Sequence, residues 1–97
     1  MIVHIVMFKF KEEDKQANLV KVRAILEQLP KKIDELIAIE VGINFDTADR
    51  AMDLSLYSTF KTKEDLASYA VHPAHVKVVD FIKTVVTESK VVDYIQP

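Results

Sequence analysis

Residues 2–10 read Ile-Val-His-Ile-Val-Met-Phe-Lys-Phe, and this stretch decides the fold. It is rich in β-branched and aromatic residues, which favours a β-strand. The even positions place one set of side chains on one face: Ile2, His4, Val6, Phe8 and Phe10. The odd positions place Val3, Ile5 and Met7 on the other face. Because both faces are apolar as far as Lys9, each of them has to be covered by something other than water.

Three later segments predict helices. Apolar residues recur at helical spacing from Asp14 to Leu29 and stop before Pro30, so we expect an amphipathic helix capped by Asp14. Thr62 is followed three residues later by Asp65, which resembles a capping box and predicts a short helix. Pro73 suits the first turn of a last helix. Its predicted apolar stripe consists of Val76, Val79, Ile82 and Val86.

Three further segments predict strands, at residues 36–43, 52–60 and 90–96. The resulting order is that of an α+β, ferredoxin-like layer, an antiparallel four-stranded sheet with helices on one face. The other face carries Val3, Ile5, Met7 and Tyr57, and a patch of this kind usually marks an interface. Two sheets packed through this face form a symmetric homodimer with a barrel-like centre, a dimeric α/β-barrel.

Composition limits the possible partners. The 97 residues contain one glycine and no linker or repeat, so we expect a single domain over residues 1–97. The net charge of −2, without a block of like charges, favours neither nucleic acid nor an anionic membrane as a partner. The chain has no cysteine, which excludes thiol catalysis and fits a reducing compartment. No apolar run approaches about 18 residues, so a cytoplasmic protein is expected.

Histidines are the first candidates for a functional site. His72 and His75 lie at the start of the last predicted helix, and a helix N-terminus favours a neutral imidazole and bound anions. Both properties suit a general base or a site for a substrate carbonyl. His4 shares a strand face with Phe8, so its ring needs a partner or a cavity beneath the helices. Together with Phe8 and with Tyr69, three residues before His72, these histidines predict a ligand pocket.

Simpler readings of the same residues remain open. His4 can be a core histidine bonded to a backbone carbonyl, and Tyr69 can be a core residue. A metal site could combine His72 and His75 with His4 or Asp80, but the His-Glu-x-x-His pattern is absent and we predict no metal. No serine lies in a Gly-x-Ser-x-Gly elbow, and a single glycine excludes a phosphate loop. No cofactor is therefore predicted.

The chain resembles the stress-responsive A/B barrel domains, also called Dabb domains or dimeric α/β-barrels. The matching blocks run through nearly the whole chain: HIVMFKF (4–10), EVGIN (40–44), DLSLYSTF (53–60), EDL (64–66), Tyr69, HPAH (72–75) and VDY (92–94). The resemblance implies a ferredoxin-like subunit that dimerises through its sheet.

The family resemblance also suggests roles for the candidate residues. Most members have no assigned reaction, several are described by their induction under stress, and a plant member is a polyketide cyclase that closes a ring by aldol condensation. By this resemblance His75 would be the base, Tyr69 would orient it or the substrate carbonyl, and His4 would line the pocket. The cyclase carries a tyrosine on its first helix where this chain has Val22, so one polar wall is missing.

Three functions follow as hypotheses. The first is a stress-linked homodimer whose pocket binds a small apolar or carbonyl-containing molecule without catalysis. The second is an enzyme in which His75, assisted by Tyr69 and His4, removes a proton next to a carbonyl in an aldol, lyase or cyclase reaction. The third is a heme or quinol monooxygenase, which rests on shared architecture alone, and a fold does not determine a function.

Overall fold

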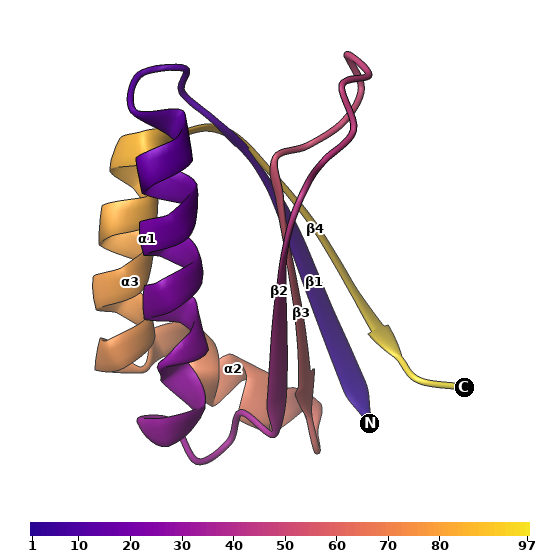
Figure 1. The fold of residues 1–97 in the computed structure, drawn as a ribbon. Coiled ribbons are helices and arrows are strands. Elements are labelled where there is room, and N and C mark those ends of the chain that lie inside the picture. The colour runs from indigo at the N-terminus through magenta and orange to yellow at the C-terminus, as the bar shows by residue number, and fades with distance from the viewer.

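Strand β1 (Ile2–Phe10) is an inner strand of a four-stranded sheet in the computed structural model, which describes residues 1–97 (Figure 1). It pairs on one side with β3 (Leu54–Phe60) and on the other with β4 (Val86–Ile95). Strand β2 (Ala38–Ile43) forms the far edge beside β3. All pairs are antiparallel, and the order β2-β3-β1-β4 confirms the predicted ferredoxin-like sheet.

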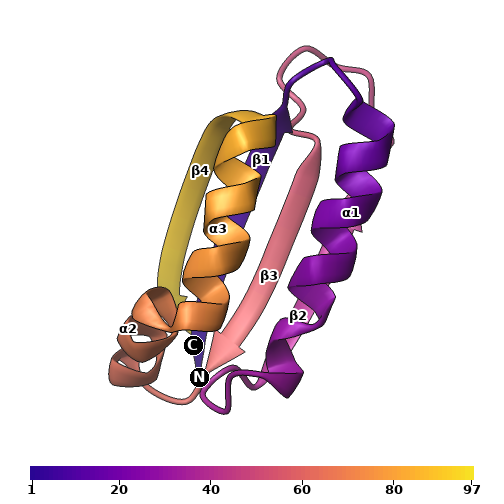
Figure 2. The same ribbon diagram turned by 90° about the vertical axis from the view of Figure 1, so that its left-hand side faces the viewer.

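The helices lie on one face of this sheet. Helices α1 (Lys15–Glu27) and α3 (Pro73–Val85) run side by side across it, and α2 (Lys63–Val71) lies at the end where β1 begins (Figure 2). A short 3-10 helix, η1 (Leu29–Lys31), follows α1. None of the helices has the length and apolar character needed to cross a membrane.

Strand register determines which side chains share a face. Ile5 lies opposite Tyr57 on β3 and Val92 on β4, and directly opposite residues project from the same side of a sheet. This open face therefore carries a continuous group of apolar and aromatic side chains: Val3, Ile5, Met7, Tyr57, Val92 and Tyr94. On the helix side, His4 lies opposite Ser58 and Asp93.

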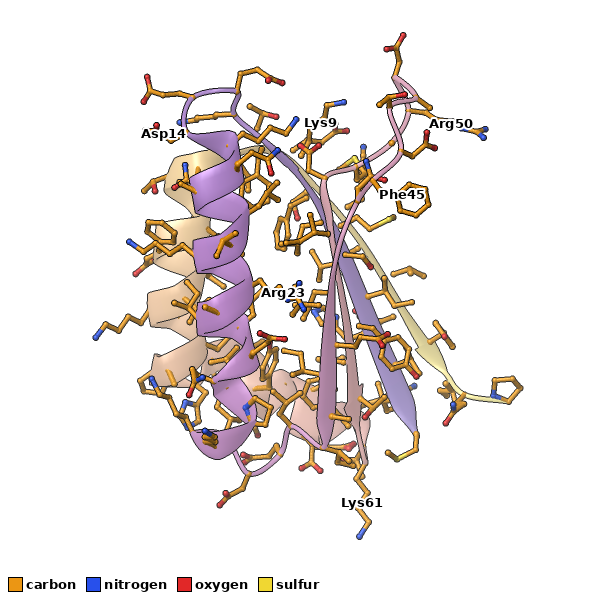
Figure 3. The ribbon with its side chains drawn as sticks, in the orientation of Figure 1. Lys9, Asp14, Arg23, Phe45, Arg50 and Lys61 are labelled. Atoms are coloured by element: carbon orange, nitrogen blue, oxygen red, sulfur yellow. The ribbon has the colours of Figure 1, made fainter.

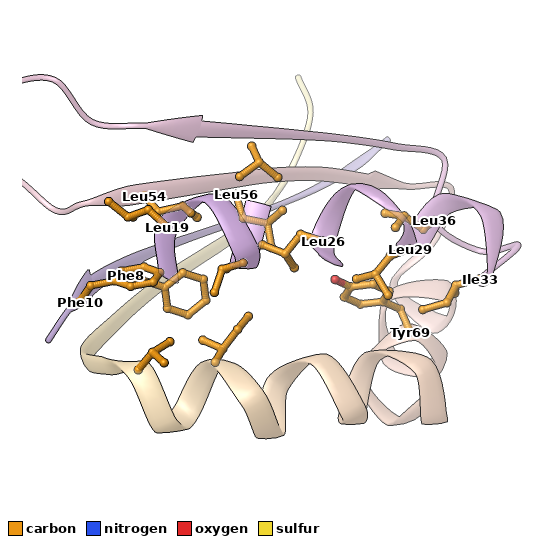
Figure 4. Close-up of a cluster of buried hydrophobic side chains, with 14 of the residues drawn as sticks. Phe8, Phe10, Leu19, Leu26, Leu29, Ile33, Leu36, Leu54, Leu56 and Tyr69 are labelled. Atoms are coloured by element: carbon orange, nitrogen blue, oxygen red, sulfur yellow. The ribbon is translucent and has the colours of Figure 1, made fainter. Parts of the chain in front are cut away.

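The hydrophobic core lies between the sheet and the helices (Figure 4). Phe8 and Phe10 of β1 pack there with Leu19 and Leu26 of α1, as the alternation of residues 2–10 predicts. Each such side chain contributes about 1.5–3 kcal/mol when it is fully buried. Ile82 and Val85 complete the core from α3.

Asp53 anchors the loop between β2 and β3 to strand β1. Its backbone N–H donates to the carbonyl of Phe8 over 2.8 Å, and its Oδ2 accepts from the N–H of Phe10 over 2.7 Å. Its Oδ1 lies 3.2 Å from the ammonium group of Lys15. Although Asp53 is charged, the structure buries it.

The predicted helix ends need correction. Asp14 precedes α1, but it has a left-handed backbone (φ 53°) and its side chain makes no cap hydrogen bond. Helix α1 ends at Glu27 rather than Leu29, because Pro30 forces the chain into the 3-10 turn η1. The cap predicted at Thr62 is confirmed, since its hydroxyl accepts from the N–H of Asp65.

The predicted strand bounds and the stripe of α3 also shift. Strands β2, β3 and β4 begin at residues 38, 54 and 86 instead of 36, 52 and 90. Strand β4 is longer because it pairs with β1 as far as Phe10, and this makes Val86 a strand residue. Val76 is 42% exposed, since α3 turns Val78, Ile82 and Val85 toward the core at a spacing of four and three residues.

Candidate functional site

A cavity of about 220 Å³ lies between the sheet and the two long helices. Strand β1 contributes His4, Val6 and Phe8, and α3 contributes His75, Val78, Val79 and Ile82. Leu26, Leu56, Ser89 and Val91 complete the lining. The only polar side chains in this set are those of His4, His75 and Ser89. The cavity is therefore an apolar space with a few polar groups, which is typical of a small-molecule site.

Tyr69 lies in the last turn of α2 and does not itself line the cavity, but its ring is next to those of the lining histidines. Its ring centre is 4.2 Å from that of His75 and 6.3 Å from that of His4. The hydroxyl is buried and has no hydrogen-bond partner. Figure 4 shows its oxygen pointing along the core toward Leu26, which lines the cavity. An unpaired buried hydroxyl costs about 1–3 kcal/mol, so a bound acceptor would relieve a penalty that the folded chain already carries.

Burial also fixes the protonation state of this hydroxyl. Desolvation raises the pKa of Tyr69 from 10.0 to about 12, because the phenolate cannot be hydrated there. Tyr69 is therefore a neutral phenol at physiological pH. It can donate a hydrogen bond to a carbonyl oxygen but cannot act as a base.

His75 has the properties of a base. Its Nδ1 lies 3.1 Å from the carbonyl oxygen of Ala70, which can only accept, so Nδ1 carries the proton and Nε2 keeps a free lone pair. Burial lowers the pKa of His75 from 6.5, the bond to Ala70 opposes this shift, and the charges of His4 and His72 add to it. The imidazole is therefore neutral at pH 7 and able to accept a proton.

The lowered pKa of His75 predicts that folding stability falls as the pH drops from about 7 to about 5. Below about 6.5 the unfolded chain binds a proton at His75 that the folded protein disfavours, whereas above it both states are neutral. Urea unfolding at both pH values measures this loss. His75→Gln should show a smaller loss than the wild type, and His72→Asn should keep most of the loss, because burial, the largest cause of the lowered pKa of His75, is unchanged. Equal pH dependence in the wild type and His75→Gln would contradict the prediction.

His4 forms a hydrogen-bonded pair with Asp93. The carboxylate oxygen Oδ1 of Asp93 accepts from Nδ1 of His4, across the β1–β4 register. The simpler reading of His4, as a histidine bonded to a backbone carbonyl, is therefore wrong. On the β3 side of the strand, the Ser58 hydroxyl donates to the His4 carbonyl over 3.0 Å and holds the His4 backbone in place. The Asp93 carboxylate orients the ring and leaves Nε2 of His4 free.

His72 lies outside this group. It is the N-cap residue of α3, and its Nδ1 accepts from the N–H of Ala74 over 3.0 Å. Its ring therefore satisfies the helix N-terminus and does not line the cavity. The structure also gathers no group of three or more histidine, aspartate or glutamate side chains that could hold a metal, so neither His4 nor Asp80 joins His72 and His75 in the alternative metal site.

Sequence reasoning missed Asp93 and Ser89 as part of the site. Asp93 is a charged residue on the helix-facing side of β4, the side that it shares with Ser89 and Val91. A charge on that side of a strand is a signal of a buried partner. Naming His4 as the partner, however, required the strand register.

Comparisons with known proteins agree with this fold. Residues 2–96 match the family model of the Stress Responsive A/B Barrel Domain, Dabb. A stress-response A/B barrel domain-containing protein of Arabidopsis thaliana is 35% identical over 82 residues, which cover 81% of this chain and 30% of that protein. The chain spans less than half the length of the curated relatives that it matches.

Two solved structures illustrate the similarity. A dimeric protein of unknown function with a ferredoxin-like fold, from Bacteroides fragilis, is 32% identical with a TM-score of 0.87, over 96% of this chain and 93% of that one. A hydroxynitrile lyase from Passiflora edulis has a TM-score of 0.88 at 21% identity, over 99% and 93% of the two chains, which is a likeness of fold alone. Since the family model covers nearly every residue, this chain belongs to the stress-responsive A/B barrel (Dabb) family.

Proposed function

We propose that this chain forms a homodimer whose cavity binds a small, mostly apolar molecule that carries a carbonyl group. The observation that carries the proposal is the buried, unpaired hydroxyl of Tyr69, whose ring centre lies 4.2 Å from that of the cavity-lining His75. A carbonyl oxygen accepts a hydrogen bond from it, whereas a hydrocarbon leaves it unpaired. An apolar cavity of about 150 Å³ holds benzene in another protein, so about 220 Å³ has room for one ring with a short substituent.

The open face of the sheet supports the homodimer. In a single copy it leaves Met7, Val92 and Tyr94 substantially exposed. Phe45, on the loop between β2 and β3, is 98% exposed and projects on the side away from the helices (Figure 3). The relative from Bacteroides fragilis is dimeric. Two copies packed through their sheets bury this surface and leave both helix layers outside. The cytoplasm stays the predicted location of this dimer.

The proposal is tested with two probes that differ at one non-hydrogen position. These are 4-fluoroacetophenone and 4-fluoro-α-methylstyrene, in which a CH2 group replaces the carbonyl oxygen. Fluorine NMR titration of the wild type should show about tenfold tighter binding of the ketone, since the Tyr69 hydroxyl gains an acceptor. Tyr69→Phe should bind both probes with equal affinity.

Tyr69→Phe is a suitable variant because it removes only an unpaired hydroxyl. Its thermal unfolding temperature should equal or exceed that of the wild type. Failure of the wild type to bind either probe would contradict the proposal. So would an unchanged preference for the ketone in Tyr69→Phe.

The second candidate function is proton abstraction next to the bound carbonyl, and the neutral, oriented imidazole of His75 favours it. His75 Nε2 would take a proton from the α-carbon, the C–H electron pair would form the enolate, and Tyr69 would donate a hydrogen bond to the enolate oxygen. Exchange of the methyl hydrogens of 4-fluoroacetophenone in D2O measures this step.

Catalysed exchange should fall about 100-fold in His75→Ala and persist in His72→Asn, whose side chain lies outside the cavity. Exchange at the buffer rate in the wild type, with the ketone bound, would remove the enzyme candidate and leave the binding function. Exchange that is equal in the wild type and His75→Ala would exclude His75 as the base.

A further inference from the structure

A second hollow, of about 330 Å³, lies on the outer surface between α1 and α3. Its polar side chains are Lys21, Lys32, Lys77 and Gln28, and its apolar part includes Ile25, Val78 and Phe81. We call this hollow the lysine groove. Helices α1 and α3 cover the side of the sheet opposite its open face (Figure 2), so the proposed homodimer leaves the groove between these helices accessible.

No acidic side chain balances the positive charge of the lysine groove. None of Lys21, Lys32 and Lys77 forms a salt bridge, and no aspartate or glutamate lines the groove. The Lys21 ammonium group lies 4.2 Å from the centre of the Phe81 ring, a cation–π contact that holds this charge over the apolar part. Three unpaired cations around a concave surface create a local positive potential, although the whole chain has a net charge of −2. The groove is therefore complementary to an anionic group attached to an apolar body.

The groove adjoins the inner cavity. Val78 lines both hollows, and it is the side chain that they share. From Val78 the cavity continues toward His75 and His4, while the groove continues toward Lys21 and Lys77. A ligand long enough to extend past Val78 would contact both sets of polar groups.

We infer that the ligand is an amphiphilic oxo-carboxylate. Its carbonyl-bearing apolar end occupies the cavity beside Tyr69, and its carboxylate stays on the lysine groove. This inference rests on the proposed function, because the cavity must first accept a carbonyl group. It adds that the ligand is an anion and that the ligand enters between α1 and α3.

The test uses 4-(4-fluorophenyl)-4-oxobutanoate, which joins the fluorophenyl ketone to a carboxylate, and its uncharged primary amide. The wild type should bind the carboxylate about fivefold to tenfold more tightly than the amide, since exposed charge pairs contribute modestly but three lysines act together. The preference should shrink as NaCl rises from about 20 mM to about 500 mM.

Two triple variants with equal loss of charge locate the effect. Lys21→Gln/Lys32→Gln/Lys77→Gln should remove the preference for the carboxylate. Lys31→Gln/Lys61→Gln/Lys83→Gln, which changes exposed lysines outside the groove, should keep it. Tyr69→Phe should weaken both the carboxylate and the amide, because both place the ketone in the cavity.

The outcomes separate this inference from the proposed function. If 4-fluoroacetophenone binds but the carboxylate and the amide bind equally, the groove inference is wrong and the cavity function stands. If the carboxylate is preferred but Tyr69→Phe binds it like the wild type, the molecule occupies the groove alone and passage into the cavity is contradicted. Equal loss of preference in the two triple variants would show a general charge effect and would also contradict the inference.

Discussion

Asp53→Ala is expected to lower the free energy of unfolding by about 3 kcal/mol, which corresponds to about 15 °C in the unfolding temperature of a domain of this size. The substitution removes the acceptor for the N–H of Phe10 and the partner of Lys15. The N–H of Phe10 then lies buried without a partner, whereas Lys15 can move its ammonium group into water. Urea unfolding at fixed protein concentration measures the change, since the stability of the proposed homodimer would depend on concentration.

Two milder variants separate the two contributions of Asp53. Lys15→Met removes only the ion pair and should cost less than about 1 kcal/mol. Asp53→Asn keeps an oxygen for the N–H of Phe10 and should lie between the other two variants. The hydrogen bond to Asp53 raises the pKa of Lys15 above 10.5, so the ion pair is fully present at pH 7 and is lost only in strong alkali. If Lys15→Met costs as much as Asp53→Ala, the loop is held by the ion pair and this account of the anchor is wrong.

Ile5→Glu is expected to convert the homodimer into a folded monomer at micromolar concentration. Ile5 lies at the middle of the open sheet face, between Tyr57 and Val92. Two-fold symmetry places the new carboxylate in the interface twice, and an unpaired buried charge costs several kcal/mol. The dimer dissociation constant should rise by on the order of 100-fold or more, as measured by sedimentation equilibrium.

Val20→Glu is the matched control for Ile5→Glu. Val20 is 65% exposed on α1, in the helix layer, so the same chemical change lies outside the proposed interface. This variant should remain dimeric. A wild-type protein that sediments as a monomer, or an Ile5→Glu variant that stays dimeric with native unfolding behaviour, would contradict dimerisation through the sheet.

Most of the fold could be predicted because its determinants are local in sequence. The two apolar faces of residues 2–10 predict a strand covered on both sides, and Pro73 marks the break between α2 and α3. The ends of β4 could not be predicted, because its first residues, Val86 to Ser89, are strand only through their pairing with β1. Val76 had the correct residue type for the stripe of α3, but packing against α1 and the sheet decides the rotation of a helix.

The site was less predictable than the fold. Helical and strand periodicity places His4 beneath the helices, and the structure brings its ring near those of Tyr69 and His75. The pair between His4 and Asp93 joins residues at opposite ends of the chain, so it depends on the register of two strands. His72 was predicted to bind ligand, yet its ring had a competing local partner in the N–H of Ala74.

The most direct test of the central claim, that Tyr69 donates a hydrogen bond to a carbonyl in the cavity, is the infrared stretching frequency of bound 4-fluoroacetophenone labelled with 13C at the carbonyl. A hydrogen bond weakens the C=O bond, so the band should lie at lower frequency in the wild type than in Tyr69→Phe, where it should resemble the ketone in an apolar solvent. The same frequency in both proteins would show that the Tyr69 hydroxyl does not contact the carbonyl, and the proposed site would be wrong.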